Sequence, residues 1–157
     1  MPLGSKNDIK RCDNKTELER VFEEYRYKGY KKLLVQEFLN KKCEVCTLGA
    51  LFNSKNGEEN ICGGVLIKER ETFNGSTSYA VCAADVNDLE QNVKHTYNNL
   101  GNKLSNVTEQ ELIDVVRINK KLLERLYDND YKGSYDIEYF ICDDGIYLNE
   151  IMHCKRC

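Results

Sequence analysis

Apolar and polar residues alternate along three stretches in the middle of the chain, which is the pattern of half-buried β-strands. These stretches are residues 45–52, 61–67 and 79–82. Asn-Gly pairs at 56–57 and 74–75 separate them, and Asn-Gly tolerates the positive φ angles of a tight hairpin turn. The pattern therefore predicts a three-stranded antiparallel meander.

The end of the chain alternates in the same way. Every second position of one stretch is apolar: Tyr135, Ile137, Tyr139 and Ile141. Asp144-Gly145 then supplies a turn, and a second apolar side follows at Ile146, Leu148 and Met152. This stretch predicts a C-terminal β-hairpin.

Helical spacing, with apolar residues three and four positions apart, fills the remaining stretches. A capping box of Thr16 and Glu19 predicts a helix start, and Thr108 with Glu111 predicts another. The predicted helical stretches are 16–28, 30–38, 86–100 and 108–126. Within the second of these, residues 33–38 can also be read as a strand.

Together these elements predict an α+β fold with one antiparallel sheet of about five strands, a three-strand meander plus the C-terminal hairpin. About four helices would pack with that sheet. A chain of 157 residues with 41% hydrophobic and 31% charged residues can bury a core of its own. We expect a single domain over 6–157, because no stretch resembles a linker, and residues 1–5 are typical of an expression-tag remnant.

Charge is spread unevenly but mildly. Residues 1–42 carry 11 Lys or Arg and 7 Asp or Glu, about +4, which leaves about −7 for the rest of a chain with net charge −3. A nucleic-acid interface usually needs a clustered basic surface, so we do not expect nucleic acid as a partner. We also expect no membrane span, because no apolar run reaches about 18 residues.

The eight cysteines raise the question of disulfides. They are Cys12, Cys43, Cys46, Cys62, Cys82, Cys142, Cys154 and Cys157. Their even number, and their positions on neighbouring predicted strands and near the ends of the chain, favour a disulfide-stapled fold of unknown connectivity. Disulfides persist in oxidising compartments, so this interpretation predicts a secreted protein whose signal peptide has been replaced by the tag.

Two C-x-x-C pairs allow an alternative. Cys43, Cys46, Cys154 and Cys157 have the right number and type of ligands for a tetrahedral zinc site. Cys154 comes 108 positions after Cys46, which is far more than the usual spacing of about 15–20 between such pairs. The leading expectation is therefore no cofactor, with zinc as the alternative.

Tyrosine is abundant around the C-terminal hairpin. Four tyrosines there form a candidate partner surface: Tyr131, Tyr135, Tyr139 and Tyr147. Tyrosine offers a large contact area with few rotatable bonds and a polar tip, which suits protein recognition. Asn74, in a predicted turn, is a candidate glycosylation site.

These observations predict a secreted, disulfide-stabilised protein that binds a host or extracellular macromolecule, as an effector or recognition module, without catalysis. The first alternative is an intracellular interaction domain stabilised by a four-cysteine zinc site. A small secreted ribonuclease-like enzyme is the third, and it would use His95 with charged residues of 68–71. No catalytic residues are assigned.

Overall fold

The computed structural model describes residues 9–53, 59–72, 75–83, 86–100, 104, 106–129 and 131–153. The chain forms two compact units, Met1–Leu39 and Asn40–Cys157, which we call the N-terminal unit and the sheet unit. Each is described by itself. The expectation of a single domain stays a prediction.

The N-terminal unit contains one helix, α1, Lys15–Tyr27. Its N-cap is Asn14, whose side-chain oxygen accepts a hydrogen bond of 2.9 Å from the backbone N–H of Glu17. The predicted cap at Thr16 is wrong, because Asn14 provides this bond two residues earlier and Thr16 lies inside the helix. The carboxylate of Glu17 accepts from the backbone N–H of Asp13, which completes the start of the helix.

After α1 the chain does not return to a helix. Gly29 has a φ of +87°, which ends α1, and residues 31–40 form neither helix nor strand. The helix or strand predicted over 30–38 is therefore wrong. Its apolar residues Leu34, Val35 and Phe38 are exposed, so they lack the packing surface that stabilises a short helix.

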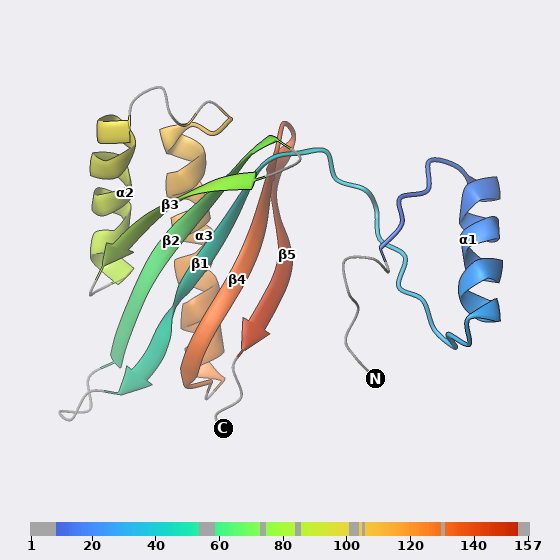
Figure 1. Ribbon diagram of the computed structural model, residues 1–157. Helices are drawn as coiled ribbons and strands as arrows, with labels where there is room; N and C mark the ends of the chain where they lie inside the picture. Colours follow the sequence, from blue (N-terminus) through green and yellow to red (C-terminus); the bar gives the residue numbers. More distant parts are fainter. Residues whose placement is uncertain are drawn as a thin grey trace. The chain divides into compact units, whose positions relative to one another are not determined.

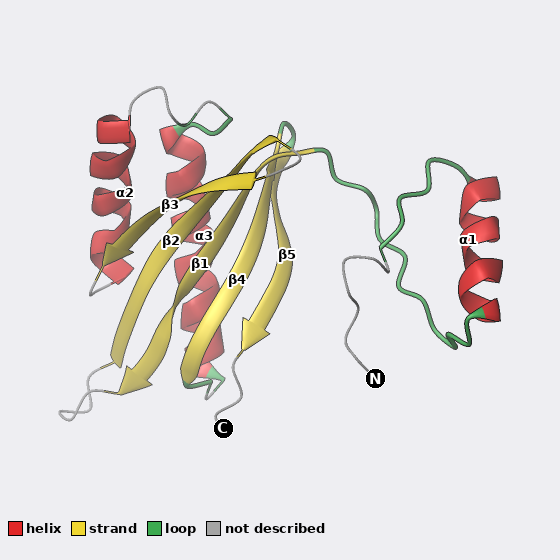
Figure 2. Cartoon of the chain, viewed as in Figure 1, coloured by secondary structure: helices red, strands yellow, loops and turns green. Residues whose placement is uncertain are grey.

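The sheet unit is built on five antiparallel strands, drawn as arrows in Figures 1 and 2, in the order β3-β2-β1-β4-β5. Their bounds are β1 Lys41–Asn53, β2 Glu59–Thr72, β3 Gly75–Ala83, β4 Gly133–Cys142 and β5 Gly145–His153. Strands β1 and β4 are adjacent although about 80 residues separate them in sequence. They join the meander to the C-terminal hairpin.

Two helices lie on the same face of this sheet (Figure 1). Helix α2, Val86–Leu100, packs against β2 and β3, and α3, Glu109–Asp128, packs against β1 and β4. We call this the helix-facing side and the opposite one the outer side. No other described element of the sheet unit covers the outer side.

The core lies between the helices and the sheet. Buried side chains from neighbouring strands meet in rows, such as Ile67, Val45 and Tyr139, which are cross-strand partners. One polar group enters this core from α3. The side-chain oxygen of Asn119 accepts hydrogen bonds of 2.7 Å from Thr47 and 3.1 Å from the hydroxyl of Tyr139.

The predicted fold needs two corrections. The described residues contain three helices, of which α2 and α3 pack on the sheet, whereas about four were predicted. The predicted disulfide stapling is also wrong for the cysteines that the structure describes. Cys12, Cys43, Cys46 and Cys142 form no disulfide with one another.

Strand geometry explains why Cys43 and Cys46, which are close in sequence, do not form a disulfide. Cys43 and Cys46 are three residues apart in β1, so their Cα atoms are about 10 Å apart and their side chains point to opposite sides. A disulfide needs Cα atoms within about 7 Å. The expectations of secretion and of an effector role were drawn from disulfides, and they lose that support.

None of the helices in the described part of the chain combines the length and the apolar character needed to cross a bilayer.

Candidate functional site

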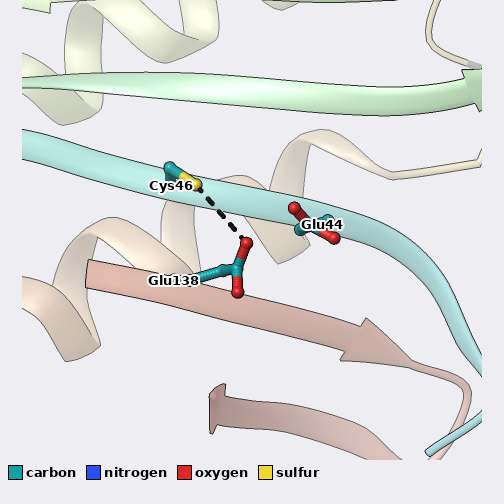
Figure 3. Close-up of side chains that lie close together, drawn as sticks. All are labelled: Glu44, Cys46 and Glu138. Carbon is teal, nitrogen blue, oxygen red and sulfur yellow. Dashed lines mark hydrogen bonds between the residues drawn. The ribbon is translucent and has the colours of Figure 1, made fainter. Parts of the chain in front are cut away.

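A thiol and two carboxylates meet on the outer side of the sheet (Figure 3). Glu44 and Cys46 project from β1, and Glu138 projects from β4, where it lies directly opposite Cys46. The thiol of Cys46 is 3.9 Å from Oε1 of Glu138, and the donor atoms of all three residues lie within 4.8 Å of one another. Glu44 and Cys46 are buried, although no described helix of the sheet unit covers this side.

Polar neighbours hold both carboxylates. The ammonium of Lys41 pairs with Glu44 and lies 3.8 Å from the centroid of the Phe140 ring. The side-chain amide of Asn149, on β5, donates to the other carboxylate oxygen of Glu138. The cluster is therefore a mixed group of one cation, two anions, a thiol and an amide.

Thiolate and carboxylate oxygen are both zinc ligands, and three protein ligands are the usual number in a catalytic zinc site. In this arrangement, however, Lys41 already places a positive charge at Glu44. A buried carboxylate needs such a partner to offset the cost of leaving water. The ion pair explains the burial of Glu44 without a metal ion.

The predicted four-cysteine zinc site is not assembled by the described residues. Cys43 belongs to the core on the helix-facing side, whereas Cys46 contacts Glu138 on the outer side. One metal ion cannot reach both sulfur atoms in this arrangement. Cys154 and Cys157, the other two candidate ligands, lie outside the described residues.

The remaining cysteines are separated in the fold. Cys12 is half-buried in the N-terminal unit, and Cys142 is buried at the end of β4. Burial raises the pKa of the Cys142 thiol, and the carboxylates of Asp144 and Asp143 raise it further. Cys62 and Cys82 belong to adjacent strands, but the register places Cys82 opposite Gly64.

The four candidate tyrosines do not form one surface. Tyr135 and Tyr139 are buried in the core, so a partner cannot contact them in this arrangement. Tyr131 and Tyr147 are half-buried, and their hydroxyls donate to the carbonyl of Ser134 at 2.5 Å and the carboxylate of Asp144 at 2.9 Å. The strict alternation that suggested this surface is instead the signature of a core strand.

An irregularity in β5 creates a different surface beside these tyrosines. Leu148 pairs with Tyr139 and Glu150 pairs with Glu138, so Asn149 is an extra residue, a β-bulge. The bulge shifts the alternation of β5 by one position. Beyond it Ile151, opposite the core residue Ile137, lies on the helix-facing side, whereas the predicted Met152 is the register partner of Asp136.

Large apolar side chains of β5 and of α3 are exposed. Leu148 is 49% exposed and Ile151 is 40% exposed, because α3 covers β1 and β4 but not β5. Ile118 of α3 is 41% exposed. It lies about 160° around the helix axis from Lys120, which hydrogen-bonds to Asn87 of α2, so it is on the side of α3 away from α2. We call Leu148 and Ile151 the β5 strip.

The β5 strip borders an unpaired strand edge. Strand β5 ends the sheet order, and in the described part of the sheet unit only β4 pairs with it. An edge strand offers backbone N–H and C=O groups to any extended chain that reaches it. The edge and the strip together provide hydrogen-bonding groups and apolar area in one place.

Two other predicted positions contribute no site. His95 is exposed on α2, where its ring lies 3.2 Å from the side-chain nitrogen of Asn99, and no described carboxylate is paired with it. Asn74 lies outside the described residues.

Comparison of the chain with protein-family models, with curated proteins and with solved structures found no match. The functional argument therefore depends on the residues and their geometry alone.

Proposed function

We propose that this protein acts by binding another protein, and that it does so by adding an extended segment of the partner to the edge of β5. The exposed β5 strip beside this edge is the observation that carries the proposal. The partner's backbone would pair with β5, and its apolar side chains would cover Leu148 and Ile151.

Side-chain exposure supports this surface over the rest of the sheet unit. Among the residues of that unit whose side chains are described, the other large apolar side chains exposed to a similar degree are Ile118 on α3, at 41%, and Leu48 on the outer side of a central strand, at 40%. Neither a helix nor a central strand has a free backbone edge to offer. Among the strands whose side chains are described, β5 combines exposed apolar side chains with a free edge.

The bulge at Asn149 supports the same interpretation. Bulges are frequent at sheet edges, where they redirect side chains. Without it Glu150 would take the place of Ile151 beside Leu148, and the strip would contain a charge. The local irregularity thus keeps this side of β5 apolar from Ile146 to Ile151.

The test uses peptides selected from a random extended-peptide library against the full chain. Leu148→Lys combined with Ile151→Lys should weaken the selected peptides at least about tenfold, because buried apolar anchors dominate such interfaces. The matched control is Leu48→Lys, which changes an equally exposed leucine away from the edge and should leave affinity within about twofold.

A second arm separates strand addition from simple apolar contact. Methylating every second backbone nitrogen of a selected peptide gives two variants, one for each set of alternating N–H groups. The variant that blocks the N–H groups facing β5 should lose binding, because it removes donors from the strand ladder. Peptides that bind the double variant as well as the parent chain, or that tolerate methylation at every position, would show that the proposal is wrong.

A further inference from the structure

A second surface, independent of the β5 strip, is formed where α1 ends in the N-terminal unit. The backbone N–H of Gly29 donates to the carbonyl of Arg26 at 3.0 Å, and that of Tyr30 donates to the carbonyl of Tyr25 at 3.0 Å. This pair of bonds is a Schellman motif, which needs the positive φ of Gly29. The motif fixes the direction in which the chain leaves the helix.

The aromatic side chains reinforce this turn. The rings of Tyr25 and Tyr30 meet edge to face with centroids 5.3 Å apart, and Tyr25 is buried. The ammonium groups of Lys10 and Lys28 lie 5.5 and 5.2 Å from the centroid of the Tyr25 ring. Tyr30 is therefore held in place by both its backbone and its ring.

The turn encloses a shallow groove with a volume of about 590 Å³. Its apolar lining comes from Phe22 on the helix and from Tyr30 and Leu33 after it. Phe22 and Tyr30 are exposed, so part of this lining is open to solvent. The groove can accept one large apolar side chain.

The charged lining of the groove is mainly basic. Arg26, Lys31 and Lys32 contribute three positive charges, and Glu23 contributes one negative charge. The negative end of the α1 dipole, about half a charge, only partly offsets this excess. The groove thus attracts carboxylates.

The N-terminal unit exposes many of its large apolar residues. Its large exposed apolar residues are Ile9, Phe22, Tyr27, Tyr30, Leu34, Val35 and Phe38. The buried hydrophobic residues among its described residues are Val21 and Tyr25. An apolar surface of this kind on a small unit is typical of a protein-binding site.

We infer that this groove binds a short acidic segment of a partner protein that carries one large apolar side chain. The apolar residue would sit against Phe22 and Leu33, and flanking carboxylates would pair with Arg26, Lys31 and Lys32. Glu23 disfavours a continuous polyanion such as RNA. Residues 9–39 as a whole hold eight Lys or Arg and six Asp or Glu, a balance that suits a mixed acidic and apolar ligand better than a phosphate backbone.

The test titrates the full chain with a labelled peptide that has a central Leu flanked by Asp and Glu, and follows fluorescence anisotropy. Lys31→Glu combined with Lys32→Glu should weaken binding at least about tenfold, and Phe22→Ser should do the same through the apolar lining. Raising ionic strength from about 0.05 to 0.5 M should also weaken binding several-fold, because salt screens the exposed charges.

The controls change a lysine and an aromatic residue of α1 that do not line the groove. Lys15→Glu and Tyr27→Ser, the latter 95% exposed, should leave affinity within about twofold. The inference is overturned if a peptide with Lys in place of the acidic residues binds equally well, if single-stranded RNA binds as tightly as the acidic peptide, or if the groove variants bind like the controls. None of these results depends on the β5 strip.

Discussion

At the scale of single residues, a glycine in β2 makes room for a core tyrosine. Gly63 pairs with Gly49 of β1, which in turn pairs with Tyr135 of β4. A Cβ atom at Gly63 would lie 2.6 Å from the hydroxyl oxygen of Tyr135, well inside contact distance. The two glycines therefore give the Tyr135 side chain a path across the helix-facing side of the sheet.

We expect Gly63→Ala to destabilise the protein by about 1–3 kcal/mol, the usual cost of overpacking a core. Replacing Tyr135 by Phe removes the colliding oxygen, so the same glycine change should cost much less in the Tyr135→Phe background. Urea unfolding of the two single variants and the double variant measures this coupling. Equal penalties in both backgrounds would mean that the hydroxyl is not the obstacle.

At the scale of elements, one carboxylate ties the start of α3 to the start of β1. Glu111 accepts hydrogen bonds from the backbone N–H of Thr108 at 2.8 Å and from its hydroxyl at 2.9 Å. The Thr108 hydroxyl accepts from the backbone N–H of Glu111, which completes the predicted capping box. The ammonium of Lys42 lies 2.6 Å from the other carboxylate oxygen.

These contacts shift the titration of Glu111. Burial alone would raise its pKa, but the hydrogen bonds from Lys42 and Thr108 together outweigh burial and lower the pKa below its ordinary 4.5. A carboxyl whose folded pKa lies below its unfolded pKa stabilises the fold above the unfolded value. That stabilisation is lost as the pH falls through the folded pKa.

We therefore expect Glu111→Gln to lower the free energy of unfolding by about 0.5–1 kcal/mol near neutral pH, because the amide can still cap α3 but no longer pairs with Lys42. The difference from the parent chain should shrink below about pH 4.5, as Glu111 becomes neutral in the parent as well. Thermal unfolding at several pH values measures it. Glu124→Gln, an exposed position on the same helix, is the control, and a difference that is independent of pH would contradict the ion pair.

At the scale of the whole molecule, the two units differ in what holds them together. In the sheet unit, β1 has a partner strand on each side and buries Val45 and Leu51. In the N-terminal unit, α1 has 13 residues and buries only Val21 and Tyr25. Isolated helices of about this length are marginally stable in water, because the free-energy cost of nucleating a helix is not offset by the hydrogen bonds of only a few turns.

Amide hydrogen exchange should make this difference visible. We expect the amides of α1 to exchange at least about a hundredfold faster than those of β1, because opening a marginal helix costs much less than breaking a central strand. Exchange followed by mass spectrometry of peptic fragments measures both segments in one experiment. Equal protection of α1 and β1 would show that the N-terminal unit unfolds only together with the sheet.

Signals that act over a few residues could be predicted from the sequence alone. The capping box of Thr108 and Glu111 marked the start of α3, and the alternation from Tyr135 to Ile141 marked a strand with one buried side. The local signals gave wrong predictions where another residue nearby in the sequence had a stronger effect on the backbone. Asn14 capped α1 ahead of Thr16, and Gly29 ended that helix before a second one could form.

The candidate sites required the tertiary structure. The even number of cysteines suggested disulfides, but the pairing of thiols depends on which strands are adjacent and which side each residue faces. Cys12, Cys43, Cys46 and Cys142 form no disulfide with one another. The bulge at Asn149 moved Ile151 to the exposed apolar strip, although the sequence alternation pointed to Met152. Local patterns determined where most helices and strands form, because those patterns act through the backbone over three or four residues. Long-range register determined which side chains meet, because a shift of one residue in a strand exchanges its two sides.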